Sequence, residues 1–135
     1  MIIYTDGACR GNPGPAAIGA VLEDESGHRV SEISRYIGHS TNNRAEYLAA
    51  IAALEEASRL CAERIELRLD SELVVRQLQG EYRVRNKDLK PLVKRARELL
   101  DSFSCFTIKH VPREQNRSAD ALANRALDKR LSPLP

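Results

Sequence analysis

The order in which strand and helix patterns follow one another constrains the fold of this chain more than any single motif. Residues 2–9 are predicted to form a strand that ends at the turn-forming residues 11–15. Residues 17–23 and 29–36 are predicted to form two further strands, joined by the hairpin signal at 24–27. Three strands connected by short turns predict an antiparallel β-meander.

The remainder of the chain alternates helix and strand patterns. Helix-capping residues at 41–43 precede apolar residues at helical spacing, which include Ala45, Leu48, Ala49 and Ala52. The later elements are predicted at 64–70 (strand), 71–79 (helix), about 88–102 (helix), 105–111 (strand) and 117–130 (helix). The order βββαβααβα predicts an α/β fold, in which helices cover both faces of a mixed five-stranded sheet. One domain is expected at 1–130, followed by a tail at 131–135.

Four acidic residues lie beside the predicted ends of separate elements. Asp6 ends a run of strand formers at 2–5 within the first predicted strand, and Asp70 ends the strand predicted at 64–70. Glu46 and Asp120 lie in the first turns of helices. Ligands gather at the carboxyl ends of parallel strands, and the positive end of a helix dipole favours an anion. If the fold brings the four carboxylates together, they repel one another unless cations bind. Ligand sets made only of oxygen favour Mg²⁺ or Mn²⁺, so the pattern indicates metal-dependent phosphate chemistry.

The net charge of +2 says little about binding partners, but its distribution is uneven. Seven basic residues and one acid lie within 83–97, and Lys90, Lys94 and Arg97 form one stripe of the predicted helix. Two interpretations stand side by side: a solvated helix face, or a surface that binds phosphates.

The cysteines and the hydropathy pattern suggest a cytoplasmic protein. Cys9, Cys61 and Cys105 lack the CxxC spacing of a zinc site, and buried free thiols are expected, with a Cys61–Cys105 disulfide as the alternative. The N-terminus carries no basic leader, and no apolar run approaches the length of a membrane span.

Five short motifs occur in an order and at spacings that match a known family. They are Tyr4-Thr5-Asp6-Gly7-Ala8, Arg10-Gly11-Asn12-Pro13-Gly14-Pro15, Thr41-Asn42-Asn43-Arg44-Ala45-Glu46, Asp70-Ser71-Glu72 and the segment 116–123, N-R-S-A-D-A-L-A. Through them the chain resembles a type 1 ribonuclease H over nearly its whole length. The resemblance implies a ribonuclease H-like sheet and hydrolysis of the RNA strand of an RNA/DNA hybrid.

The same resemblance implies that the four acids bind two divalent ions. Mg²⁺ is expected, with Mn²⁺ as the alternative. Two ions roughly 3.5–4 Å apart would activate the attacking water and stabilise the leaving 3′ oxygen. We expect Asp6 to contact both ions, Glu46 and Asp70 to flank one of them, and Asp120 to hold the other.

A mobile group in the segment before the last aspartate often assists catalysis in this family. Here His110 and Arg113 are the candidates. His110 has a familiar spacing from Asp120 but is predicted to end a strand. Arg113 resembles the arginine of a shorter, archaeal-like branch, and we favour it.

Substrate contacts follow from the resemblance as well. Asn12, Asn42 and Asn43 are expected to reach 2′-hydroxyls and minor-groove base edges, although turn formation and helix capping also explain them. Thr41 and Arg44 resemble a pocket for a DNA-strand phosphate. Gly7 and Ser71, which directly follow Asp6 and Asp70, complete the expected substrate-binding set.

Two departures from the family pattern affect substrate binding. Glu72 stands where a glutamine is frequent, which puts one RNA contact in doubt. Tryptophan is absent, and the segment 80–90 is too short for the basic handle of larger relatives. We therefore expect weaker, salt-dependent binding of hybrids by a monomer. The alternatives are a catalytically idle binding module and a domain released from a polyprotein.

Overall fold

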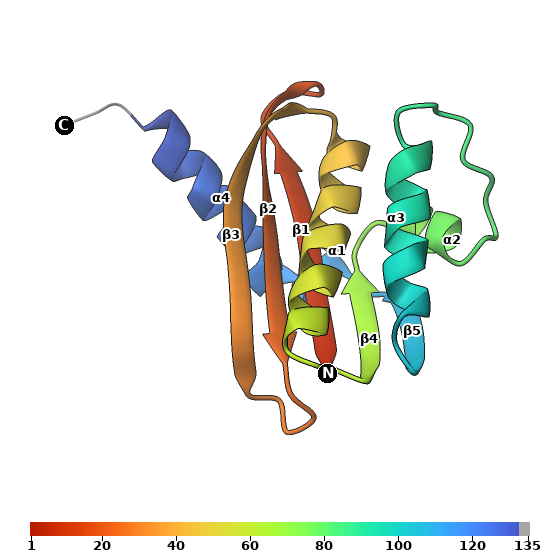
Figure 1. Cartoon of the computed structure of the whole chain (residues 1–135). Coiled ribbons are helices and arrows are strands. Elements are labelled where there is room, and N and C mark those ends of the chain that lie inside the picture. Colours follow the sequence, from red (N-terminus) through yellow and green to blue (C-terminus); the bar gives the residue numbers. More distant parts are fainter. Residues whose placement is uncertain (133–135) are drawn as a thin grey trace.

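The computed structural model describes residues 1–132, and its sheet confirms the predicted mixed architecture (Figure 1). The strands lie in the order β3-β2-β1-β4-β5. They are β1 (Ile2–Cys9), β2 (Gly14–Glu23), β3 (Arg29–Ser40), β4 (Arg64–Leu69) and β5 (Cys105–His110). β1, β2 and β3 are antiparallel neighbours, whereas β1, β4 and β5 pair in parallel. The expected meander is therefore present, and the later strands extend the sheet from β1.

The helices cover both faces of this sheet, as predicted. They are α1 (Asn42–Arg59), α2 (Glu72–Leu78), α3 (Lys90–Asp101) and α4 (Arg117–Leu131), with a short 3-10 helix, η1 (Arg113–Gln115), before α4. α1 packs on β1 and β2 with α3 beside it, and α4 crosses β1, β2 and β3 on the opposite face (Figure 1). The described part of the predicted tail begins inside α4, at Leu131, and residues 133–135 lie outside the described residues.

Two strands are longer than predicted. β2 begins at Gly14 and β3 continues to Ser40, and these two residues pair with each other. Glycine and proline at 14–15 predicted a turn, and the predicted strand at 29–36 stopped short of Gly38. The ladder nevertheless continues past an irregularity between Ala16 and Ala17, because each strand still finds a partner there.

The inward face of α1 is rotated from the one that its sequence pattern predicts. Leu48 and Ala52 are only half-buried, and Ala50, Ala53 and Ala57 are fully buried instead. α1 contacts both the sheet and α3, so it buries more of its circumference than one amphipathic stripe would. Small side chains allow this close contact on two sides.

The cysteines differ from the expectation. All three are free within residues 1–132, so the Cys61–Cys105 disulfide is absent there. Cys61 and Cys105 are exposed and Cys9 is half-buried, so the prediction of buried thiols was wrong. In the part of the chain that the structure describes, no helix is both long and apolar enough to cross a membrane.

Candidate active site

Asp6 and Asp70 lie side by side because the parallel ladder between β1 and β4 stops just before them. Thr5 and Leu69 are the last pair in this ladder. The chain leaves the sheet after Leu69, whereas β1 continues along β2 to Cys9. Asp6 thus marks the end of the parallel ladder and lies inside its own strand. Beside it the sheet has a gap into which side chains from both faces can project.

Glu46 reaches this gap from α1 because a glycine lets the helix approach β1. A Cβ atom on Gly7 would lie 2.5 Å from the backbone carbon of Ala45 and 2.6 Å from the backbone nitrogen of Glu46. The backbone N–H of Gly7 donates a hydrogen bond of 2.8 Å to Oε1 of Glu46. This contact holds the carboxylate against the strand that carries Asp6.

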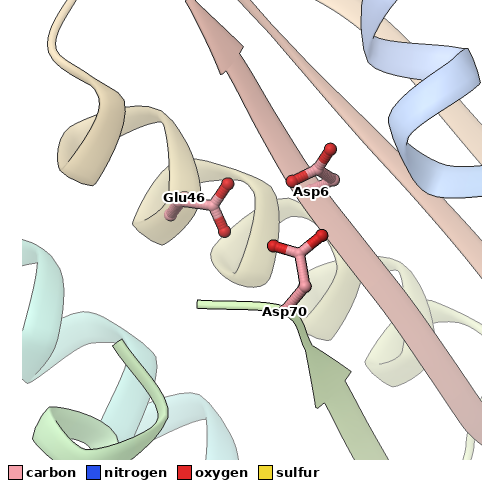
Figure 2. Close-up of side chains that lie close together, drawn as sticks. All are labelled: Asp6, Glu46 and Asp70. Atoms are coloured by element: carbon pink, nitrogen blue, oxygen red, sulfur yellow. The ribbon is translucent and has the colours of Figure 1, made fainter. Parts of the chain in front are cut away.

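Figure 2 shows the carboxylates of Asp6, Glu46 and Asp70 directed toward one another from β1, α1 and the end of β4. One oxygen from each lies within 4.8 Å of the others. Asp6 and Glu46 are buried, with exposed fractions of 5% and 7%, and Asp70 is half-buried. Three acids that are far apart in sequence therefore converge at one point.

Asp120 approaches from the opposite face of the sheet. It lies in the first turn of α4 and is half-buried. α4 docks closely because Gly19 of β2 faces it: a Cβ atom there would lie 2.0 Å from the backbone oxygen of Ala119. Since Gly19 pairs with Asp6 across the sheet, the same close approach brings Asp120 to the acid cluster.

Burial and the closeness of like charges together determine the pKa values of the cluster. Burial raises the pKa of Asp6 well above the usual range of an aspartate, and the negative charge of Glu46 adds to the rise. Burial also raises the pKa of Glu46, with further contributions from Asp70 and Asp120. In the absence of a cation the cluster retains protons, because ionising every member would place like charges next to one another.

The residues of the cluster fit a divalent cation. Oε2 of Glu46 is buried and has no hydrogen-bond partner among residues 1–132, while Oε1 is held by Gly7. A buried carboxylate oxygen without a donor is costly, and a metal ion would satisfy it. The ligand set consists of carboxylates only, which suits Mg²⁺ or Mn²⁺.

The four acids line a pocket of about 560 Å³ together with several of the predicted substrate-binding residues. Gly7, Asn42, Asn43 and Ser71 are among its lining residues. The other three predicted residues, Asn12, Thr41 and Arg44, lie outside this lining, near the start of α1.

Local hydrogen bonds account for part of what these polar residues do. Oδ1 of Asn12 accepts from the backbone N–H of Asn42, which ties the β1–β2 turn to α1. The hydroxyls of Thr41 and Ser71 accept from the backbone at the starts of α1 and α2, so both residues cap helices.

His110 and Arg113 occupy different positions relative to the acids. His110 ends β5, as predicted, and its Nε2 lies 3.2 Å from the backbone oxygen of Asp70. Arg113 begins η1 and lines the pocket. Both side chains are exposed.

Two asparagines beside the acids were absent from the predicted site. Asn124 lines the pocket and donates to Oδ1 of Asp120 at 3.2 Å. Asn116 is buried and donates to Oδ2 of Asp70 at 3.1 Å. Asn116 opens the motif 116–123 but received no role in the sequence analysis. The sequence signal for Asn124 was its place four residues after Asp120, one turn along the same helix.

Comparison with known proteins first gives the class of protein. The sequence model of a family described as "Reverse transcriptase-like" matches residues 4–126. A ribonuclease HI from Halobacterium salinarum is 54% identical over 93% of this chain, which spans 63% of that relative's length. A ribonuclease HI from Caulobacter vibrioides is 39% identical, with coverage of 94% of this chain and 92% of the relative.

Solved structures agree with these matches. The crystal structure of RNase H1 from Halobacterium salinarum superposes with a TM-score of 0.93 at 53% identity, covering 95% of this chain and 97% of that one. LC11-RNase H1, solved in complex with an RNA/DNA hybrid, gives a TM-score of 0.91 at 46% identity, with coverage of 97% and 99%. The chain therefore belongs to the type 1 ribonuclease H (ribonuclease HI) family.

Proposed function

We propose that this protein is an endonuclease that hydrolyses the RNA strand of RNA/DNA hybrids with the help of two divalent ions. The observation that carries the proposal is the buried Oε2 of Glu46, which lacks a hydrogen-bond partner among the described residues. Its carboxylate belongs to a cluster with those of Asp6 and Asp70. Anion binding alone would gain nothing from grouped acids. The hybrid bound to the related LC11-RNase H1 supports this choice of substrate.

The four carboxylates have separate roles in this proposal. Asp6 would serve as a ligand for both ions, Glu46 and Asp70 would help to hold one of them, and Asp120 would hold the other. Bound Mg²⁺, or alternatively Mn²⁺, would lower the pKa of a water molecule and stabilise negative charge on the leaving oxygen. The rigid sheet and the two closely docked helices hold the carboxylates in place before substrate binds.

Arg113 is the group that we favour for assisting the reaction. Its guanidinium is a permanent cation at the edge of the pocket, where it would hold a phosphate oxygen of the substrate or help the product leave. His110 is the alternative, because its ring lies beside the backbone oxygen of Asp70.

Uncharged polar residues near the start of α1 would distinguish RNA from DNA. Asn42 and Asn43 line the acidic pocket and can donate to 2′-hydroxyls, and Gly7 and Ser71 complete its wall. Asn12 uses its carbonyl within the protein, so its amide group remains to contact a base edge. Thr41 and Arg44 would bind a phosphate of the DNA strand at the N-terminus of α1.

A second, basic surface would hold the hybrid away from the cleavage point. The basic groove, a hollow of about 720 Å³ between α3 and the preceding loop, is lined by Arg83, Lys90, Lys94 and Arg97 among others. Its four basic side chains outnumber the three acids that also line it, Glu81, Glu98 and Asp101, so the excess charge suits a phosphate backbone. The exposed Tyr82 at its wall offers an aromatic surface. We propose that this groove partly replaces the basic handle of larger relatives. We also propose that the protein acts as a monomer in the reducing cytoplasm.

A cleavage assay on three matched duplexes tests the proposal. RNA/DNA hybrid, duplex RNA and duplex DNA of one sequence are incubated with and without Mg²⁺. Cleavage of the RNA strand of the hybrid alone, only with Mg²⁺, is expected. Asp6→Asn should reduce cleavage at least 10³-fold with the fold retained, an order-of-magnitude estimate for losing a shared metal ligand.

The matched control is Glu25→Gln, which neutralises an exposed acid in the β2–β3 turn. It should cleave at the wild-type rate. Full activity of Asp6→Asn, or equal cleavage of all three duplexes, would overturn the proposal.

A further inference from the structure

Asn116 is buried at the junction of the three segments that carry Asp6, Asp70 and Asp120. Its exposed fraction is 1%. Its Nδ2 donates to the backbone oxygen of Thr5 at 2.8 Å and to Oδ2 of Asp70 at 3.1 Å. Its backbone oxygen accepts from the N–H of Asp120 at 3.1 Å. One residue thus bonds to β1 directly before Asp6, to the carboxylate after β4, and to the first turn of α4.

The hydrogen bonds of its amide determine how the side chain is oriented. An asparagine amide carries two N–H hydrogens, and here each has an acceptor. Turning the amide over would place Oδ1 against the oxygens of Thr5 and Asp70, both of which are acceptors. Only one orientation is therefore compatible with the surroundings.

The usual role of an asparagine in this position does not explain its side chain. Asn116 precedes the first residue of α4, where asparagine normally caps the helix with its side-chain oxygen. Its side chain makes no capping bond, whereas those of Thr41 and Ser71 cap α1 and α2. Its Oδ1 is buried without a partner among residues 1–132. An acceptor left unpaired is unfavourable, so the two donor contacts are what the side chain contributes.

We infer that Asn116 is a positioning residue for the metal-binding carboxylates, acting through Asp70 and through the start of α4. The N–H donor binds Oδ2 of Asp70, which fixes the rotation of the carboxylate and leaves Oδ1 available to a cation. Together, the contacts with Thr5 and Asp70 join β1 to the residue that follows β4 at the point where their ladder ends, so the spacing between Asp6 and Asp70 depends on them. Groups that orient ligands in this way commonly change metal affinity or activity by about 10–100-fold when removed.

This inference rests on the proposed metal site, and the experiment separates the two. Binding of Mn²⁺ alone to the full chain is measured by titration calorimetry for wild type, Asn116→Ala and Asn116→Leu. Leucine fills nearly the same space without a donor, so it separates the hydrogen bonds from the packing. Both variants should bind Mn²⁺ at least about 10-fold more weakly than wild type. With hybrid substrate, their kcat should fall while KM stays within about two-fold, because the buried amide does not reach the substrate.

Ser34→Ala is the matched control. Its hydroxyl donates to the backbone oxygen of Leu122 at 2.6 Å, so the variant loses another hydrogen bond to α4 without touching an acid. It should bind Mn²⁺ as wild type does. Wild-type affinity in folded Asn116 variants would overturn the inference, whereas no Mn²⁺ binding by wild type would overturn the metal site itself.

A measurement on unaltered protein covers the case in which the variants do not fold. The side-chain amide of Asn116 is followed by ¹⁵N NMR, with the exposed Asn86 as reference. The Asn116 amide hydrogens should exchange slowly with solvent, and their signals should move during a Mg²⁺ titration while those of Asn86 stay in place. Rapid exchange, or signals unmoved by bound Mg²⁺, would overturn the inference.

Discussion

The two carboxylate oxygens of Glu46 have different environments and different roles. Oε1 accepts from the N–H of Gly7, which fixes the side chain, and Oε2 is left buried without a hydrogen-bond partner within the described part of the chain. The first contact fixes a carboxylate that is directed toward Asp6 and Asp70 (Figure 2). A ligand held in this way needs no rearrangement when a cation enters, which favours tight and geometrically defined binding.

The assisting group can be identified by two single substitutions. Arg113→Ala should lower the turnover number about 10–100-fold, an order of magnitude expected when a charged group at a phosphate is lost. His110→Ala should lower it less than about three-fold. Single-turnover and steady-state rates on the same hybrid, measured for both variants, separate the cleavage step from product release. The reverse ranking would assign the role to His110.

Two glycines allow α1 and α4 to carry their acids to the sheet from opposite faces. Gly7 faces the backbone of α1, and Gly19 faces the backbone of α4. In both places the nearest atoms belong to a main chain, which cannot rotate away from an added methyl group. The distance from each helix to the sheet, and hence the positions of Glu46 and Asp120, depends on these two residues.

Gly7→Ala should therefore damage stability and the site together. The added Cβ overlaps the α1 backbone, so we expect a loss of about 1–3 kcal/mol in the free energy of unfolding, measured by urea denaturation. Metal-dependent cleavage should fall as well, because α1 must move outward with Glu46.

Gly27→Asn is the control for Gly7→Ala. Gly27 has a positive φ of 85° with nothing within 4 Å of an added Cβ, and asparagine tolerates that backbone conformation. Its stability should change by less than about 1 kcal/mol. A tolerated Gly7→Ala would show that the close approach of α1 to β1 is not required.

A cation bound at the proposed site should stabilise the whole molecule in a pH-dependent way. The pKa values of Asp6 and Glu46 are raised in the folded protein, mainly by burial. In the unfolded chain such groups lose their protons near pH 4. As pH rises above about 4, the unfolded state releases protons that the folded state retains, so the metal-free protein loses stability.

Thermal melting with and without Mg²⁺ measures this linkage. Without metal, the melting temperature of wild type should fall relative to that of Asp6→Asn as pH is raised from 5 to 9. Mg²⁺ should raise the melting temperature of wild type more at pH 8 than at pH 5.5, because it binds ionised carboxylates. An equal Mg²⁺ effect at both values, or an equal effect on Asp6→Asn, would contradict the proposed site.

Salt dependence tests how the basic groove contributes to hybrid binding. Each phosphate contact contributes about one unit to the slope of log affinity against log salt concentration. Lys94→Ala, in the groove, should weaken binding and reduce that slope by about one. Lys129→Ala, an exposed lysine near the end of α4, should leave the slope unchanged. Fluorescence anisotropy of labelled hybrid with Ca²⁺ in place of Mg²⁺ provides the measurement, and equal slopes for both variants would exclude the groove.

The family, the order of elements and the identity of the four acids could all be recognised from local sequence. Turn residues, periodic apolar positions and short motifs depend only on neighbours along the chain. They can therefore be recognised from the sequence before the tertiary structure is known. Because these signals report only on residues close along the chain, the boundaries of β2 and β3 were predicted wrongly. The ends of these strands pair with each other despite glycine and proline at 14–15. The same limit explains the error over Cys61 and Cys105, because exposure depends on what packs against a residue.

The amino-acid sequence by itself determined which chemical groups this protein has and in which elements they lie. The tertiary structure decided which of them meet. The register that ends at Thr5 and Leu69 opens the gap beside Asp6, and two glycines set how near the helices come. The burial of Asn116 against Asp70 follows from the same packing and has no local pattern. Such contacts join residues far apart along the chain, so their geometry exists only once the sheet and helices have assembled.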